Sequence, residues 1–324
     1  MALRHLLSIE EAETADLRLI METARSFQDV IGRPVKKVPA LRGRTVVTLF
    51  YEASTRTRTS FELAAKYLSA DAVNIAVAQS SVTKGESLKD TVRTLEAVTA
   101  DCVVMRHSSS GAPHLAAGML GIPVINAGDG RHEHPTQALL DAVTIWDAWA
   151  PGLGKRVGVD APDFTGLRVA VVGDVAHSRV ARSNAWLLTR LGAEVRFVGP
   201  ATLMPADASL LPATVHSDLR SGIDGAHVVM VLRLQTERQE AGLLPTAREY
   251  SRIWGVNRSS LAAAHPDALV MHPGPMNRGV EIAPEVADGL AGHSSAIETQ
   301  VRNGVAVRMA CLYLLMGSAA GEVL

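Results

Sequence analysis

The sequence has little cysteine, almost no net charge and no long apolar run. Its 324 residues include only two cysteines, Cys102 and Cys311, each inside an apolar segment. Their placement excludes a disulfide framework and metal-ligand spacing, and it favours buried thiols in a reducing compartment. The net charge of −1 argues against a nucleic-acid or anionic membrane partner. Because no signal peptide or bilayer-spanning run is visible, we expect a cytoplasmic protein.

Two glycine signatures of nucleotide-binding proteins are also missing. No Gly-Lys-Ser/Thr of the Walker type occurs, so a phosphate-bearing ligand need not be a nucleotide. The apolar segment Leu167–Val172 leads into Gly173-Asp174, which resembles the start of a dinucleotide-binding unit, but residues 175–178 do not complete the fingerprint. We therefore expect a Rossmann-like fold without a nicotinamide cofactor, and with no other cofactor or metal.

The chain is long enough for two domains, and its pattern is that of an α/β protein. Segments typical of buried strands alternate with segments of helical periodicity, which predicts a parallel sheet flanked by helices in each half. The predicted strands are 45–50, 72–75, 102–105, 123–126, 167–172, 195–198, 227–232 and 268–271. The predicted helices include 8–31, 134–149 and a long C-terminal one at 295–316.

Hydroxyl and guanidinium side chains crowd the corner after the first strand. Ser54, Thr55, Arg56, Thr57 and Arg58 stand where a helix is expected to begin. A helix N-terminus offers unpaired backbone N–H groups and a partial positive charge, and these side chains add donors. The alternative is a simple N-cap with solvated arginines, but a cap needs only one hydroxyl. The pattern therefore predicts a phosphate site.

Polar side chains follow the next strands at the same end. Arg106 and His107 follow the strand at 102–105, and His134 and Gln137 follow the strand at 123–126. Ligands of parallel α/β sheets bind beyond the carboxyl ends of the strands. We therefore expect these two groups to gather beside the Ser54 corner.

Assembled in order, these motifs resemble the catalytic chains of the aspartate carbamoyltransferase family, within the aspartate/ornithine carbamoyltransferase superfamily. The resemblance covers essentially the whole chain. The motifs that carry it are Phe50–Arg58, Lys84-Gly85-Glu86, Met105-Arg106-His107, His134-Pro135-Thr136-Gln137, Arg233–Arg238 and His272-Pro273-Gly274-Pro275.

The resemblance implies that the carbamoyl group of carbamoyl phosphate passes to the amine of L-aspartate, which yields N-carbamoyl-L-aspartate and phosphate in pyrimidine biosynthesis. No protein nucleophile is needed, because positioning and charge stabilisation carry the catalysis. The residues that the resemblance places in catalysis are Arg56, Thr57, Lys84, Arg106 and His134. The residues that the resemblance implies bind carbamoyl phosphate are Ser54, Thr55, Arg56, Thr57, Ser80, Lys84, Arg106, His134, Gln137, Pro273, Gly274 and Pro275.

The second half supplies the cations that a dicarboxylate substrate needs. The resemblance implies that Arg179 binds the α-carboxylate and that Arg233 with Gln235 binds the side-chain carboxylate, since guanidinium forks bind carboxylates in bidentate fashion. A surface salt bridge is the alternative for Arg179. The residues that the resemblance implies bind aspartate are Lys84, Arg179, Arg233, Gln235, Gly274 and Pro275. His272 is expected to have a structural role.

The resemblance also implies an assembly. In the family Ser80 and Lys84 reach the neighbouring chain's active site, so a homotrimer is expected; a solvated loop is the alternative for these two residues. Residues 1–149 with a C-terminal helix at 293–324 are expected to bind carbamoyl phosphate, and residues 150–292 to bind aspartate, with the active site in the cleft between these domains. The segment 150–165 is longer than usual, so the boundary within 150–166 stays open, as does association with a dihydroorotase or a regulatory chain.

Three other functions compete with this one. Ornithine carbamoyltransferase shares the phosphate motifs, but has His-Cys-Leu-Pro where this chain has His272-Pro273-Gly274-Pro275, and acidic groups where this chain has Arg233-Leu234-Gln235. A non-catalytic scaffold predicts lost donors, yet every expected donor is present. A nicotinamide dehydrogenase is disfavoured by the missing glycines.

Overall fold

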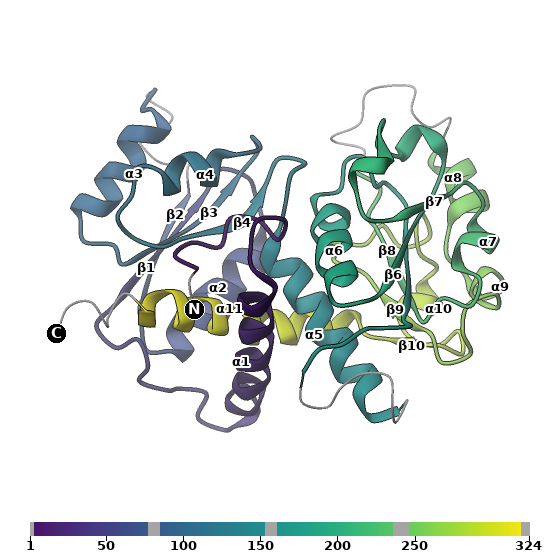
Figure 1. Cartoon of the computed structure of the whole chain (residues 1–324), viewed down its shortest axis with the longest axis horizontal. Helices are drawn as coiled ribbons and strands as arrows, with labels where there is room; N and C mark the ends of the chain where they lie inside the picture. The colour runs from purple at the N-terminus through teal and green to yellow at the C-terminus, as the bar shows by residue number, and fades with distance from the viewer. Residues whose placement is uncertain (1–2, 77–84, 153–160, 236–245, 319–324) are drawn as a thin grey trace. The chain divides into compact units, whose positions relative to one another are not determined.

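The computed structural model describes residues 3–76, 85–152, 161–235 and 246–318, and these divide by their contacts into two units (Figure 1). Unit 1 comprises Met1–Val143 and Val301–Leu324, and unit 2 comprises Thr144–Gln300. Both units contain a parallel sheet flanked by helices, so the α/β class expected from the sequence is confirmed. No helix in these described ranges has the length and apolarity needed to cross a membrane.

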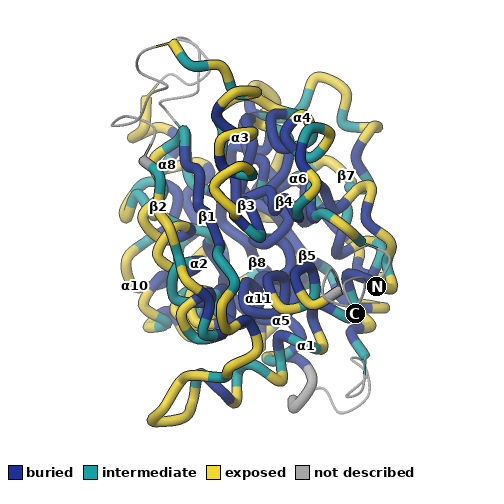
Figure 2. The backbone as a smooth tube through the Cα atoms, turned by 90° about the vertical axis from the view of Figure 1, so that its left-hand side faces the viewer, coloured by how far each residue is buried: buried dark blue, intermediate teal, exposed yellow. Residues whose placement is uncertain are grey.

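Unit 1 is built on a four-stranded parallel sheet in the order β2-β1-β3-β4. The β-branched and apolar run of β1 is almost wholly buried, whereas the edge strand β2 is largely exposed (Figure 2). The strands are β1 (Thr45–Phe50), β2 (Asp71–Ala76), β3 (Cys102–His107) and β4 (Val124–Asp129). All four predicted strands of this half are therefore confirmed, with ends that differ by at most three residues.

Helices cover both faces of this sheet. One face packs against α3 and α4 through a cluster that includes Val47, Leu49, Val92 and Met105. The helices α1, α2 and α11 lie on the other face (Figure 1). Their bounds are α1 (Thr14–Gly32), α2 (Thr55–Tyr67), α3 (Leu88–Ala97), α4 (Ala112–Ala117), α5 (Pro135–Gly152) and α11 (Ile297–Ser318).

The predicted start of the first helix at Ser8 is wrong, because α1 begins at Thr14. The preceding segment runs beside β4 instead: Leu6 donates to the Val124 carbonyl at 2.9 Å. The carboxylate of Glu133 then accepts from the amide of Ile9 at 2.8 Å and from that of Glu10 at 3.0 Å. A buried long-range acceptor thus replaces the helical hydrogen bonds that local periodicity favoured.

Two other helix ends differ slightly from expectation. Helix α5 is predicted to stop at Trp149, but it continues to Gly152. The C-terminal helix α11 spans Ile297–Ser318 rather than 295–316. Differences of this size are common at frayed helix ends.

Unit 2 has a six-stranded parallel sheet in the order β10-β9-β8-β5-β6-β7. The strands are β5 (Arg168–Val172), β6 (Glu194–Val198), β7 (Thr214–His216), β8 (Val228–Val231), β9 (Leu269–Met271) and β10 (Ser294–Ser295). Strands β7 and β10 were not predicted. They are only two or three residues long and are not buried, so they lack the apolar signal of the four central strands.

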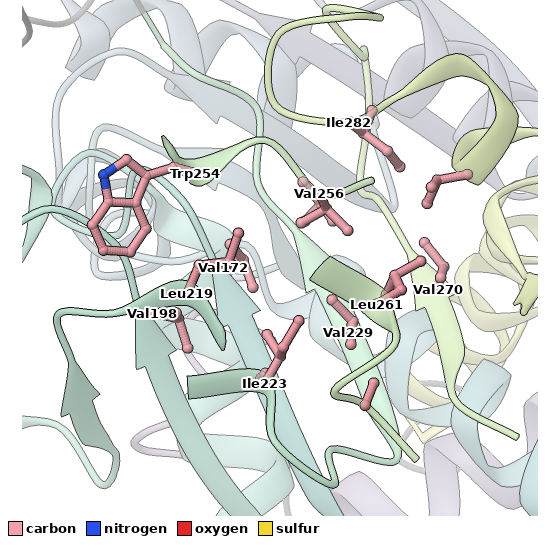
Figure 3. Close-up of a cluster of buried hydrophobic side chains, with 14 of the residues drawn as sticks. Val172, Val198, Leu219, Ile223, Val229, Trp254, Val256, Leu261, Val270 and Ile282 are labelled. Atoms are coloured by element: carbon pink, nitrogen blue, oxygen red, sulfur yellow. The ribbon is translucent and has the colours of Figure 1, made fainter. Parts of the chain in front are cut away.

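One face of this sheet carries the main core of unit 2. Leu219, Ile223, Trp254 and Leu261 pack from short helices onto strand residues such as Val229 (Figure 3). Helix α6 lies on the opposite face (Figure 1). The helices are α6 (Arg179–Arg190), α7 (Leu219–Ile223), α8 (Ala247–Trp254), α9 (Arg258–Leu261) and α10 (Pro284–Ala287), with 3-10 turns at η3 (Ala201–Leu203) and η4 (Ala208–Leu210).

Candidate functional site

The corner after β1 forms the N-terminus of α2, as the sequence predicts. Ser54 occupies the N-cap position in an extended conformation, yet its side chain makes no capping hydrogen bond. Thr57 is buried, whereas Thr55 and Arg56 are exposed. The first turn of the helix therefore combines the hydroxyl of Ser54 and exposed polar side chains with the positive end of the helix dipole. This arrangement suits an anion.

Arg106 lies beside this corner because β3 pairs with β1. The register places Arg106 opposite Phe50, and the Tyr51 amide donates to the Arg106 carbonyl at 2.9 Å. Its guanidinium forms an ion pair with Glu52 at 3.3 Å and donates from Nη1 to the Ala127 carbonyl at 3.2 Å. These contacts come from the segments after β1 and from β4, so they hold the cation at the carboxyl edge of the sheet.

His134 and Gln137 lie at the start of α5, which follows β4. Both side chains are buried. The Gln137 side chain donates from Nε2 to Oδ1 of the buried Asp141, one turn further along the helix, at 2.9 Å. This bond assigns the amide orientation, because only Nε2 can donate to a carboxylate. The carbonyl oxygen Oε1 of Gln137 is therefore presented as an acceptor.

His107 and Tyr51 also lie at this edge, with ring centroids 4.5 Å apart. The His107 Nδ1 accepts from the Ser109 amide at 2.9 Å, so its proton stands on Nε2 in the neutral form. Burial is the main cause that lowers the pKa of His107, although Asp129, the Ser109 amide and Glu52 act in the opposite direction. His107 is thus a neutral donor near physiological pH.

The titration of His107 is expected to make the free energy of unfolding decrease as pH falls. Above its ordinary pKa of 6.5 the imidazole is neutral in both states. Below 6.5 the unfolded chain binds the proton first, so stability is lost as pH falls through the lower folded pKa. Urea unfolding between about pH 7.5 and about pH 5 measures the slope.

The matched comparison is His107→Gln against His216→Gln, since His216 lies on β7 of the other unit. Glutamine at 107 can still accept from the Ser109 amide but does not titrate. We expect the first variant to flatten the pH dependence and the second to leave it unchanged. Equal slopes in the parent chain and His107→Gln would contradict the assignment. His5, whose pKa burial also lowers, contributes a slope that both chains share.

Ser80 and Lys84, which the sequence places in the site, lie outside the described residues. Their predicted contribution to a neighbouring chain stays a prediction. The same holds for Thr236, Glu237 and Arg238 at the end of the Arg233 motif.

In unit 2, Arg179 follows the turn after β5. It is the first residue of α6 and is 4% exposed, and the preceding Ser178 caps the helix by accepting from the Ala181 amide at 3.1 Å. A buried pair braces the turn, because His177 Nδ1 lies 2.6 Å from Oδ1 of Asp174. Arg179 is thus attached to a braced turn and is buried.

Arg233 and Gln235 follow β8, the neighbour of β5 in the sheet. Both are half-buried, whereas Leu234 between them is 2% exposed. The alternation anchors the segment through Leu234 and turns the flanking polar residues away from the core. The Leu234 carbonyl also accepts from the side chain of Asn277 at 3.3 Å, which ties this segment to the one after β9.

The turn after β9 carries Pro273, Gly274 and Pro275, and the Gly274–Pro275 peptide bond is cis. The contacts of His272 hold this turn in place. Its Nδ1 accepts from the Gly274 amide at 2.8 Å, its own amide donates to Gln300, and its Nε2 lies 3.4 Å from the buried carboxylate of Glu281. These contacts support the expected structural role of His272.

Those predicted site residues that the structure describes form two groups, one in each unit. In unit 1 the segments after β1, β3 and β4 converge through strand pairing, and in unit 2 those after β5, β8 and β9 do so. Sequence reasoning missed three supporting carboxylates: Glu52, Asp141 and Glu281. Only Asp141 had a usable signal, since it stands four residues after Gln137 on the same helix face.

Comparisons with protein families match both halves of the chain. Residues 4–147 match the carbamoyl-P binding domain of aspartate/ornithine carbamoyltransferases. Residues 165–315 match the Asp/Orn binding domain of the same family. The two matches occur in this order and cover most of the chain.

Similar sequences span nearly the full length. The aspartate carbamoyltransferase catalytic subunit of Desulforudis audaxviator is 56% identical over 316 residues, which are 98% of either chain. The corresponding subunit of Pelotomaculum thermopropionicum is 57% identical over 314 residues, or 97% of either chain.

Solved structures agree with the sequences. Aspartate transcarbamoylase from Trypanosoma cruzi in complex with N-(phosphonacetyl)-L-aspartic acid (PALA) has a TM-score of 0.81 and 31% identity, covering 96% of this chain and 95% of that one. Ornithine carbamoyltransferase from Pyrococcus furiosus also has a TM-score of 0.81, with 28% identity and 97% of each chain covered. The resemblance found in the motifs is confirmed, and the chain belongs to the aspartate/ornithine carbamoyltransferase family.

Proposed function

We propose that this chain transfers the carbamoyl group of carbamoyl phosphate to the amine of L-aspartate and so forms N-carbamoyl-L-aspartate and phosphate in pyrimidine biosynthesis. The observation that carries the proposal is the 56% identity, over 98% of both chains, to a catalytic subunit of an aspartate carbamoyltransferase. The motifs at the strand ends, quoted above, support the same reaction from the chemistry of their side chains.

Unit 1 supplies the groups for carbamoyl phosphate. The first turn of α2, with Ser54, Thr55, Arg56 and Thr57, offers hydroxyls, a guanidinium and the positive helix end to the phosphate. Arg106 and His134, with the Thr57 hydroxyl, donate to the carbonyl oxygen, where negative charge grows as the amine attacks. Such preorganised donors are usually the largest contribution to catalysis of acyl transfer.

Gln137 binds the amino group of the carbamoyl moiety. Its Nε2 is engaged by Asp141 at 2.9 Å, so Oε1 accepts from the carbamoyl NH2. Asp141 in turn lies near the buried guanidinium of Arg308, whose pKa burial lowers to about 10 although Asp141 raises it. Asp141 is therefore a positioning residue, held in place by α11.

Replacing Gln137 by leucine is expected to raise the KM for carbamoyl phosphate by about 2- to 13-fold, because a neutral hydrogen bond contributes about 0.5–1.5 kcal/mol. Steady-state kinetics at saturating aspartate provide the measurement. Gln28→Leu is the control, since Gln28 also donates to a side-chain oxygen in unit 1, that of Asn303, but stands on α1. An unchanged KM in Gln137→Leu would remove Gln137 from the site.

Unit 2 supplies the groups for aspartate. Arg179 binds the α-carboxylate, and Arg233 with Gln235 binds the side-chain carboxylate. The turn formed by Pro273, Gly274 and Pro275 presents backbone carbonyls to the amine and to the carbamoyl group, and the contacts of His272 hold that turn in place.

The reaction needs no protein nucleophile. The amine nitrogen attacks the carbonyl carbon, the bond from that carbon to the phosphate oxygen breaks, and the electron pair leaves with phosphate. The leaving phosphate accepts the proton that the amine loses. The protein contributes position and charge stabilisation, which together account for many orders of magnitude in rate.

We also propose a homotrimer in which Ser80 and Lys84 of one chain complete the site of the next, and a cytoplasmic location. The family resemblance supports the first, and the two free, buried cysteines support the second. Analytical ultracentrifugation tests the assembly, since a trimer has three times the mass of the 34.4 kDa chain.

A colorimetric assay for the ureido product tests the function itself. The purified chain is given carbamoyl phosphate with either L-aspartate or L-ornithine. We expect product from aspartate only. Product from ornithine would overturn the assignment of Arg233 and Gln235, and no product from either amine would favour a non-catalytic scaffold.

A further inference from the structure

A cluster of two histidines and two carboxylates lies in unit 1, and the proposed reaction does not use it. His114 belongs to α4, Asp129 ends β4, and His132 stands in the following turn. One potential ligand atom of each lies within 4.8 Å of those of the other two. Glu11, from the segment before α1, joins them through His114.

One distance in the cluster is close to that between ligands of a tetrahedral metal ion. His132 Nδ1 lies 3.1 Å from Asp129 Oδ2, and a ligand atom of His114 lies within 4.8 Å of both residues' ligand atoms. With zinc–nitrogen and zinc–oxygen bonds of about 2.0–2.1 Å, neighbouring tetrahedral ligands stand about 3.3–3.4 Å apart. His132 and Asp129 therefore have a separation that a cation could bridge with small adjustments.

Asp129 is preorganised for this purpose. It is fully buried, and it accepts from the Gly111 amide at 2.7 Å, the Asn126 side chain at 2.8 Å and the Glu133 amide at 3.1 Å. These donors fix the carboxylate: the Gly111 amide binds Oδ2, and the other two donors bind Oδ1. Partners of this kind orient metal-binding carboxylates in known sites.

His114 presents a lone pair in one tautomer. Its Nδ1 is buried and makes no hydrogen bond among the described residues. With the proton on Nε2, where Glu11 accepts it, Nδ1 is the unprotonated nitrogen that can bind a cation. The ring of His132 stands nearly edge-on to that of His114, with centroids 5.6 Å apart, so the two imidazoles approach from different directions.

We propose that His114, His132 and Asp129 form a binding site for Zn²⁺ or a similar borderline divalent cation, with Glu11 as the outer partner of His114. Two imidazoles with one carboxylate and an open fourth position suit such a cation, whereas Mg²⁺ and Ca²⁺ prefer oxygen ligands alone. The site goes beyond the proposed reaction and takes no part in it.

A bound cation would join helix α4 to the turn after β4, in which His132 stands two residues before His134. Through the contact of His114 with Glu11 it would also hold the stretch before α1. The cross-link would stabilise the folded chain by mass action, since the unfolded chain does not hold these segments together.

The test measures zinc binding without substrates, so its outcome is independent of the carbamoyl transfer. The whole chain is treated with a chelator and dialysed against ZnCl2, and the number of zinc ions bound per chain is measured. Thermal unfolding is then followed with and without zinc. We expect one zinc per chain and a higher unfolding temperature with zinc.

Three variants locate the site. Loss of an outer partner of a metal ligand lowers metal affinity by about 10- to 100-fold. His114→Gln removes a ligand itself, so its zinc affinity should fall by more than this. Glu11→Gln should weaken binding as well, and because its side chain is 66% exposed the substitution leaves folding intact. His216→Gln, a control in unit 2, should bind zinc like the parent chain.

Three results would overturn the proposal. They are no zinc bound by the parent chain, equal affinity in the parent and His114→Gln, or stabilisation by Mg²⁺ that matches zinc and is lost in His114→Gln. The first two would reduce the cluster to a hydrogen-bond network. The third would exclude a borderline cation.

Discussion

Replacing Arg106 by alanine is expected to lower kcat for carbamoyl transfer by about 100- to 1000-fold, the usual cost of removing a donor to a developing oxyanion. The guanidinium is held at the carboxyl edge by Glu52 at 3.3 Å and by the Ala127 carbonyl at 3.2 Å. It is therefore in position before substrate binds. Steady-state kinetics with saturating aspartate and carbamoyl phosphate measure the loss.

Arg44→Ala is the matched control. Arg44 forms an ion pair with Asp101 at 2.8 Å, and these two residues immediately precede β1 and β3. Glu52 follows β1, and Arg106 lies near the end of β3. The control pair therefore stands at the opposite end of the same two strands. The control removes the same kind of partly exposed pair from the same sheet, and its kcat should stay near that of the parent chain. A similar loss in both variants would attribute the effect of Arg106 to the stability of the sheet rather than to catalysis.

Replacing Arg233 by alanine is expected to raise the KM for aspartate by about 10- to 150-fold, because a hydrogen bond to a charged group contributes about 1.5–3 kcal/mol. The KM for carbamoyl phosphate should change little. Arg233 is a cleaner probe than Arg179, which is 4% exposed and whose truncation would also disturb packing.

Arg196→Ala is the control for this variant. Arg196 belongs to the same unit and forms an ion pair with Glu194 at 2.7 Å on β6. Both kinetic constants of the control should match the parent chain. A collapse of carbamoyl phosphate affinity in Arg233→Ala, with normal aspartate dependence, would contradict the division of work between the two units.

The sequence was informative where a local pattern coincides with the site. The run Thr45–Phe50 predicts its strand to the residue, and the hydroxyls that follow it predict the N-terminus of α2. Because parallel strands end at one edge, the grouping of Arg106 with the Ser54 corner also follows from local patterns. Ser54 occupies the N-cap position but makes no capping hydrogen bond, and the arginines that follow it are exposed.

Contacts between distant residues could not be predicted in this way. Glu133 binds the amides of Ile9 and Glu10 more than 120 residues away, and this contact displaces the start of α1. The support of the Pro273 turn by His272 and Glu281 depends on backbone folding that no spacing rule describes. Local periodicity carries no information on such partners.

The central claim is that cations of unit 1 hold the phosphate and cations of unit 2 hold the dicarboxylate of one reacting pair. PALA, which carries a phosphonate and an aspartate in one molecule, tests it most directly by calorimetric titration. The parent chain, Arg44→Ala and Arg196→Ala should bind PALA alike, while Arg56→Ala and Arg233→Ala should each weaken binding by at least about tenfold. Unchanged affinity in either of the last two variants would contradict the account.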